Sequence, residues 1–155
     1  MSTNGRSSDV AHRLSRGLGI PCVAIEGQEV VFGGRARSVL VVFVNGLGGA
    51  ECLWVLEHAL AVSIAGAFLH QHSEELHAAR QEDRLPQHLE KALSEFFRTA
   101  LPVSEEALRF EGIHTQIGSA LRPDVEALLH DSPSTQPLQL TLQGYGSGRL
   151  TALGH

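Results

Sequence analysis

The sequence predicts a single α+β domain in which a mostly antiparallel sheet packs against two main helices. Three observations indicate this class. Apolar, β-branched or alternating segments occur towards both ends of the chain, two segments of helical periodicity lie between them, and neither a regular βαβ alternation nor an internal repeat is present. A length of 155 residues fits one domain with one core.

The first part of the chain predicts a polar start followed by extended chain. Residues 1–17 are expected to form a flexible segment or a short helix over Asp9–Arg16, with the domain itself spanning 18–155. Extended chain is expected over Val23–Phe32, and Gly33–Gly34 interrupts it.

A strand pair is the clearest predicted element. Ser38–Val44 is an uninterrupted apolar run rich in β-branched residues, which indicates a central strand. Asn45–Gly46 is a strong hairpin signal, so Cys52–Leu56 is expected to return beside the first strand.

Two later segments have the periodicity of helices. Glu57–Gln71 is apolar on almost every side, so we expect it to be buried around much of its circumference. After a polar connector with a short helix at Glu74–Ala79, Pro86–Leu101 predicts an amphipathic helix with Pro86 in its first turn. Its apolar stripe consists of Leu89, Leu93, Phe96, Phe97 and Ala100.

The last part of the chain returns to strands around one short helix. Alternation of leucine with polar residues indicates a half-buried strand that pairs with the C-terminal segment across a glycine-rich turn. The expected elements are a strand at Leu108–Ile117, a helix at Pro123–Leu129, a loop at Asp131–Pro137, a strand at Leu138–Gln143, a turn at Gly144–Gly148 and a strand at Arg149–Leu153.

The glycine-rich segments NGLGG at 45–49 and GYGSG at 144–148 are expected to be turns. A phosphate-binding loop requires a helix N-terminus directly after it, because the free N–H groups of that helix bind the anion. A strand is expected after NGLGG, and only seven residues follow GYGSG. Nucleotide binding is therefore disfavoured at both loops.

Composition narrows the classes of partner. A formal net charge of −5 opposes binding to nucleic acid or to an anionic membrane. The two cysteines, Cys22 and Cys52, are too few for a disulfide scaffold, and no apolar run has the length of a membrane span. We therefore expect a reduced, cytoplasmic protein without a cofactor.

A histidine-rich connector is the weak candidate for a metal site. His70, His72 and His77 lie close to two glutamates in the sequence, and imidazole with carboxylate is a ligand set for divalent metals. The HExxH pattern is absent and no cysteine is near. The favoured interpretation is a solvated connector with no metal.

The polar face of the 86–101 helix is the candidate partner-binding surface. It carries both signs of charge, and its members are Glu90, Lys91, Ser94, Glu95 and Arg98. Glu95 and Arg98 are three residues apart and hence neighbours on a helix. The competing interpretation is a solvated face whose local ion pairs contribute little to stability.

The order of elements resembles the CheC/CheX-type chemotaxis phosphatase family, including the related domains of flagellar switch proteins. The matching parts are the strand pair before the first main helix, the helix–connector–helix segment at 56–101 and the final strands LQLTLQGYGSGRLTAL at 138–153. The resemblance covers roughly residues 20 to 153 and rests on pattern more than on identities.

The resemblance implies a site on the second main helix. In the family, an acidic residue docks the aspartyl phosphate of a response regulator by pairing with a lysine of that protein, and an asparagine three positions on orients the attacking water. Mapped onto this chain, these positions fall on Glu95 and Arg98. A second such motif would lie near Glu57–Gly66, where no asparagine occurs.

Arginine in place of asparagine argues against the reaction, because a guanidinium has five donors and no acceptor. The leading hypothesis is a CheX-like domain, a degenerate phosphatase, that binds a receiver domain or a like subunit in bacterial signalling without catalysis. The alternative is a divergent phosphatase in which Arg98 stabilises transition-state charge and Glu95 or Glu90 handles the water. A third hypothesis is a homodimer formed through an exposed strand or helix face.

Overall fold

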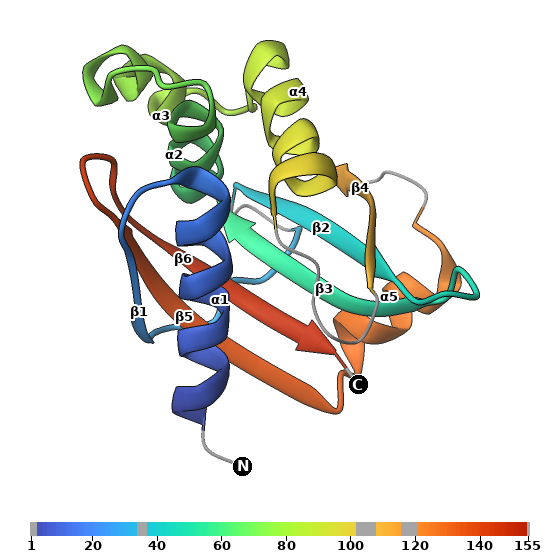
Figure 1. Ribbon diagram of the computed structural model, residues 1–155. Helices are drawn as coiled ribbons and strands as arrows, with labels where there is room; N and C mark the ends of the chain where they lie inside the picture. The colour runs from blue at the N-terminus through green and yellow to red at the C-terminus, as the bar shows by residue number, and fades with distance from the viewer. Residues whose placement is uncertain (1–2, 34–36, 102–107, 116–120, 155) are drawn as a thin grey trace.

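The computed structural model describes residues 3–33, 37–101, 108–115 and 121–154, with the backbone alone over 3–8. Within these residues, six strands form one antiparallel sheet in the order β1-β5-β6-β3-β2-β4 (Figure 1). The strands are β1 (Cys22–Glu26), β2 (Ser38–Val44), β3 (Ala50–Glu57), β4 (Arg109–His114), β5 (Ser134–Leu142) and β6 (Gly146–Gly154). The predicted α+β class is confirmed.

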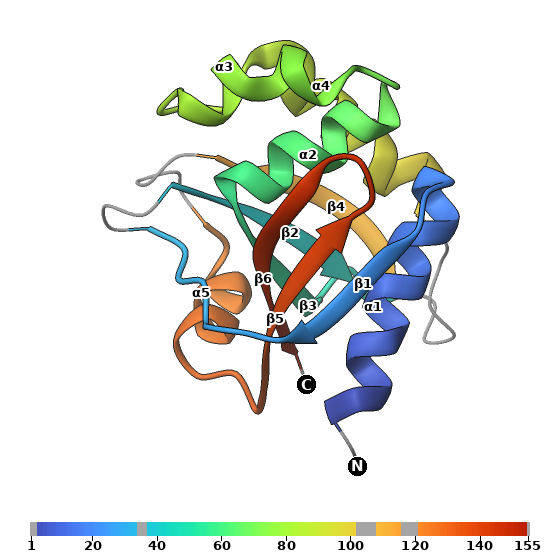
Figure 2. The ribbon, with the colours of Figure 1, turned by 90° about the vertical axis from the view of Figure 1, so that its left-hand side faces the viewer.

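The described helical elements cover both faces of this sheet. Figure 2 shows α1 and α5 on opposite sides, with α2 and α4 above the sheet. No helix of the described segments has the length and apolar character needed to span a membrane. The helical elements are α1 (Thr3–Leu18), α2 (His58–Phe68), the 3-10 turn η1 (Ser73–Leu76), α3 (His77–Gln81), α4 (Gln87–Glu95), the π-helical turn η2 (Phe96–Ala100) and α5 (Pro123–His130).

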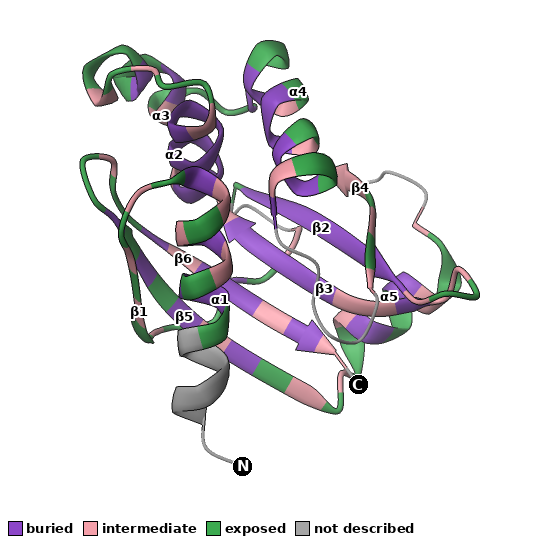
Figure 3. Ribbon diagram, in the orientation of Figure 1, coloured by how far each residue is buried: buried purple, intermediate pink, exposed green. Residues whose placement is uncertain are grey.

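The strand β2 is buried from end to end because helices lie on both faces of the sheet (Figure 3). Val41 and Phe43 belong to the core beneath α1, α2 and α4. Leu40 and Val42, which point the other way, belong to a second core beneath α5. This two-sided burial explains the uninterrupted apolar run, and the predicted pairing of β2 with the following strand is confirmed.

The N-terminal helix α1 is longer than the short helix expected over Asp9–Arg16. Val10, Leu14 and Leu18, spaced at four residues, are buried in the same core as α2 and α4. Gly17 allows a close approach, since a Cβ there would lie 2.8 Å from the ring of Phe96. The apolar stripe thus docks α1 against the sheet and η2.

The second helix and the final turn have the predicted character. Nine residues of α2 are buried, which confirms a helix enclosed on nearly all sides. The turn between β5 and β6 places Gly144 and Gly146 at φ of 86° and 93°, in the region that glycine adopts without strain. Gly148 has a different role, because a Cβ there would lie 2.6 Å from the Cβ of Leu60 in α2.

The predicted amphipathic helix changes geometry near its end. Pro86 precedes α4 as its N-cap residue, and the chain widens into a π-helical turn at Phe96. The N–H of Leu101 donates to the carbonyl of Phe96 at 2.9 Å, five residues back. The four predicted core positions from Leu89 to Phe97 are buried as expected. Because the turn is wider, Leu101 is buried and Ala100 is only half-buried.

Two predicted strand boundaries are wrong. The strand β6 begins at Gly146, whereas a turn was expected up to Gly148. The expected loop over Asp131–Pro137 enters β5 at Ser134. The carbonyl of Pro137 accepts a hydrogen bond from the N–H of Gly27, just past the end of β1. The nitrogen of a strand residue faces the same side as its carbonyl, so the nitrogen of Pro137 faces away from β6. No hydrogen bond between β5 and β6 is therefore lost at this proline.

The other expected boundaries differ less. The extended chain leaves the sheet after Glu26. One short helix was expected at 74–79, where the structure has η1 and α3. The predicted positions 34, 116 and 117 lie outside the described residues.

Candidate functional site

The polar face of α4 and η2 is presented to solvent. Lys91, Glu95 and Arg98 are exposed, whereas Glu90 and Ser94 are half-buried. The same turns point Leu93 and Phe96 into the core, with no exposed area, so the backbone beneath this face is held by packing. The five residues that the sequence singled out therefore share one accessible strip along the helix.

Glu95 and Arg98 form the centre of this strip. A guanidinium Nη1 of Arg98 lies 3.5 Å from Oε2 of Glu95, and the side chains are 61% and 53% exposed, respectively. An ion pair this accessible contributes less than about 1 kcal/mol to stability, because water screens both charges. Both groups thus retain most of their capacity to pair with a partner molecule.

An aromatic ring on β4 supports the guanidinium. The Cζ of Arg98 lies 5.8 Å from the ring centroid of Phe110, within the range of cation–π attraction. Phe110 in turn stacks on Phe97, with centroids 5.9 Å apart and an interplanar angle of 22°. Arg98 is therefore positioned by Glu95 on one side and by an aromatic stack on the other.

The local backbone is also specialised. The hydroxyl of Thr99 donates to the carbonyl of Glu95 at 2.7 Å, next to the π-helical turn. π-helical turns interrupt α-helices rarely and are frequent at functional sites. Within the described residues Lys91 makes no ion pair with Glu95, so its ammonium is available to a partner.

The side chains of Arg98 and Glu95 determine which groups this strip can bind. Arg98 offers N–H donors to a phosphoryl or carboxylate group, and Glu95 offers acceptors to a cation. Neither group reproduces a carboxamide, which both donates to phosphate and accepts from water. At the place of a second motif, Glu57 is engaged with Arg149, whose Nη2 lies 2.9 Å from its Oε2. The rest of that segment, on α2, is almost wholly buried.

The histidine-rich connector does not assemble a ligand set. His70, His72 and His77 are all exposed. No three histidine, cysteine or carboxylate side chains within the described residues are arranged to hold a metal ion.

Sequence reasoning missed Phe110. It lies on a strand expected from the apolar pattern, but contact with Arg98 depends on β4 pairing beside β2, underneath η2. No local pattern in the sequence indicates that a residue of β4 lies beneath η2.

The antiparallel sheet carries α1, α2 and α4 on one face and α5 on the other, an α+β fold that solved FliY and FliM structures share. The similar solved structures include Thermotoga maritima FliY, with a TM-score of 0.55 and 14% identity over 95% of this chain and 82% of that one. A chain of the FliG–FliM complex from H. pylori matches with a TM-score of 0.54 and 10% identity, covering 96% of this chain and 86% of that one.

CheX from Vibrio vulnificus matches with a TM-score of 0.46 and 12% identity, over 96% of this chain and 95% of CheX. No family model and no curated protein matches the sequence. The FliY and FliG–FliM matches confirm the fold that the resemblance implies.

Proposed function

We propose that this chain is a CheX-like protein-binding domain of bacterial chemotaxis or flagellar signalling, which binds its partner through the strip on α4 and η2 without hydrolysing a phosphoryl group. The observation that carries the proposal is Arg98. It is an exposed guanidinium held beside Glu95 and Phe110, at the position where the resemblance leads us to expect an asparagine.

A phosphorylated receiver domain is the partner whose chemistry fits this strip. A lysine of the receiver domain would form an ion pair with Glu95. The phosphoryl oxygens of the receiver domain would accept charge-assisted hydrogen bonds from the guanidinium of Arg98. Because the guanidinium has no acceptor, it would bind the phosphoryl group without orienting a water. FliM, a protein of the same fold, forms a complex with another protein, FliG, which supports a binding role for such scaffolds.

Binding is tested by calorimetry with a panel of purified receiver domains, each with and without beryllofluoride as a stable mimic of aspartyl phosphate. We expect at least one activated receiver to bind, with affinity reduced about 30-fold by Glu95→Ala or Arg98→Ala, since truncating one partner of an interfacial charge pair costs about 2 kcal/mol. Asp131→Ala, which removes an exposed carboxylate just after α5, is the matched control and is expected to bind normally. Equal affinity for all three variants would refute the assignment of this strip.

Catalysis is tested separately with the same receivers. The rate at which phosphoryl-aspartate is lost is expected to stay unchanged on addition of the chain. Acceleration that disappears in Glu95→Ala would overturn the non-catalytic proposal, and loss of turnover in Arg98→Ala would favour the divergent phosphatase instead.

A separate observation favours self-association through β1. This edge strand pairs only with β5 in the described part of the chain (Figure 2). Val23 and Ile25 are 60% and 59% exposed on the same face. An antiparallel pairing of two copies centred on Ala24 would set Val23 opposite the partner's Ile25 and keep the two Glu26 side chains apart. Unprotected apolar edges of this kind favour strand pairing between molecules.

Sedimentation equilibrium at several concentrations tests this second candidate. We expect a mass approaching twice 16.7 kDa at high concentration, reverting to 16.7 kDa in Ile25→Lys. The matched substitution Thr141→Lys, on the same face of the neighbouring strand β5, is expected to leave association intact. A monomer at every concentration would refute pairing through β1.

A further inference from the structure

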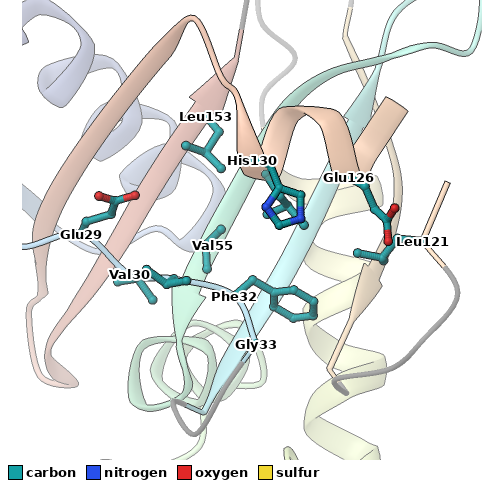
Figure 4. A pocket seen from close by; sticks show the side chains of 11 residues that line it. Glu29, Val30, Phe32, Gly33, Val55, Leu121, Glu126, His130 and Leu153 are labelled. Atoms are coloured by element: carbon teal, nitrogen blue, oxygen red, sulfur yellow. The ribbon is translucent and has the colours of Figure 1, made fainter. Parts of the chain in front are cut away.

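A pocket of about 280 Å3 opens on the sheet face that carries α5, away from the strip on α4 and η2 (Figure 4). Its floor is formed by Val55 of β3 and Leu153 of β6. One wall is the chain segment 29–33, and the other wall is α5 with the residue Leu121 ahead of it. Four stretches that are distant in the sequence therefore meet around one cavity.

The walls of this pocket are held in place from both sides. The N–H of Val30 donates to Oγ1 of Thr151 at 2.7 Å in a buried hydrogen bond, which ties the 29–33 segment to β6. On the other side, a carboxylate oxygen of Asp124 accepts from the N–H of Ala50 at 2.8 Å, which ties the start of α5 to β3. A cavity between two anchored walls is preformed, as small-molecule sites usually are.

The lining of the pocket is apolar inside and acidic outside. Val30, Val55 and Leu153 are buried beneath it. The charged residues at its opening are Glu29 and Glu126, which Figure 4 shows at opposite sides of the pocket. No lysine or arginine is among the described residues that line it.

Neither carboxylate has a partner within the described chain. Glu29 and Glu126 are exposed, and no hydrogen bond or ion pair involves either side chain among the described residues. The imidazole of His130, also at the opening, likewise makes no hydrogen bond or ion pair with the described residues. With these groups no metal ligand set is formed in the described part of the molecule. The unpaired negative charge therefore stands beside an apolar cavity.

We propose that this pocket binds a small organic cation, with an apolar or aromatic body inside the cavity and a primary ammonium at its opening. The body would gain from leaving water, and the ammonium would pair with Glu29 or Glu126. An organic anion of the same shape would meet two carboxylates and, among the described lining residues, no lysine or arginine. This proposal is independent of the strip on α4 and η2.

Three probes of nearly equal shape and different charge test the proposal: 3-phenylpropylamine, 3-phenylpropan-1-ol and 3-phenylpropionate. Each is titrated into 15N-labelled protein while backbone amide shifts are followed. We expect saturable shifts at Val30, Leu129 and His130, with the amine binding about two- to fivefold more tightly than the alcohol, the range of an exposed ion pair. The carboxylate is expected to bind most weakly.

The variants separate charge from shape. Glu29→Gln with Glu126→Gln is expected to abolish the advantage of the amine while leaving the affinity of the alcohol unchanged. Leu129→Trp, which fills the cavity, is expected to weaken all three probes. Asp131→Asn, a carboxylate that does not line the pocket, serves as the matched control. Equal or tighter binding of 3-phenylpropionate, or the absence of shifts at these lining residues, would overturn the proposal even if Leu129→Trp failed to fold.

Discussion

Replacing Gly148 with alanine adds a methyl group to the contact between β6 and α2. The new Cβ would lie 2.6 Å from the Cβ of Leu60 and 3.0 Å from its Cα. Carbon atoms in contact normally stand about 3.5 to 4.0 Å apart. The obstructing atoms belong to or adjoin the helix backbone, so the substitution requires β6 and α2 to separate by about 1 Å.

The cost follows from this displacement. Overpacking a closed contact costs about 1 to 3 kcal/mol, and backbone obstruction favours the upper part of that range. Replacing glycine also lowers the entropy of the unfolded chain, which offsets up to about 1 kcal/mol. We expect a net loss of about 2 kcal/mol in the free energy of unfolding, or about 4 to 8 °C in Tm for a chain of this size.

Urea unfolding followed by circular dichroism measures this loss. The matched control is Gly112→Ala in β4, where an added Cβ meets nothing within 4 Å and the backbone is not left-handed. That variant is expected to be neutral or slightly stabilised. A Gly148→Ala protein as stable as the Gly112→Ala protein would refute the claim that the contact between β6 and α2 leaves no room for a Cβ at position 148.

Three further predictions concern single side chains. Hydrogen bonds from Arg122 lower the pKa of Asp124, so its stabilising effect is present above the unfolded pKa of about 3.9 and is lost as the pH falls through the folded pKa. The urea midpoint of Asp124→Asn should accordingly lie below that of the parent at pH 7 and converge with it towards pH 3. Phe97→Ala removes a ring that is 3% exposed and should cost about 3 to 5 kcal/mol, measured by the same unfolding; a loss below 1 kcal/mol would contradict its core position. Burial raises the pKa of Cys22 to about 11, so native protein at pH 8 should react with iodoacetamide far more slowly at this thiol than urea-unfolded protein, as read by peptide mass spectrometry.

Periodicity in the sequence was sufficient for most of the secondary structure. Burial leaves a local pattern in the sequence. It appears as an unbroken apolar run in the strand Ser38–Val44 and as apolar residues three or four positions apart in the helical stripe from Leu89 to Phe97. Predictions went wrong where a tertiary contact overrides local preference. Pro137 stands in a strand because β1 has ended beside it, and Leu101 replaces Ala100 in the core because the helix widens.

The candidate sites divide in the same way. Glu95 and Arg98 are three residues apart on one helix, so their proximity was predictable from spacing alone. Phe110 and the pocket were not predictable, because each joins segments that only the sheet order brings together. In particular, Glu29 and Glu126 are nearly a hundred residues apart in the chain and belong to unrelated local patterns.

By itself, the sequence determined the α+β class, the strand pair, the buried helix and the charged strip, since these depend on hydrophobic periodicity and on residue types within one or two turns. Only the tertiary structure decided that Arg98 rests on an aromatic ring, that α1 belongs to the core and that an acidic, apolar-walled pocket faces the other side. The physical reason is that side chains of different segments meet only after strand pairing and helix docking have set their positions, and neither event leaves a signal in any short stretch of residues.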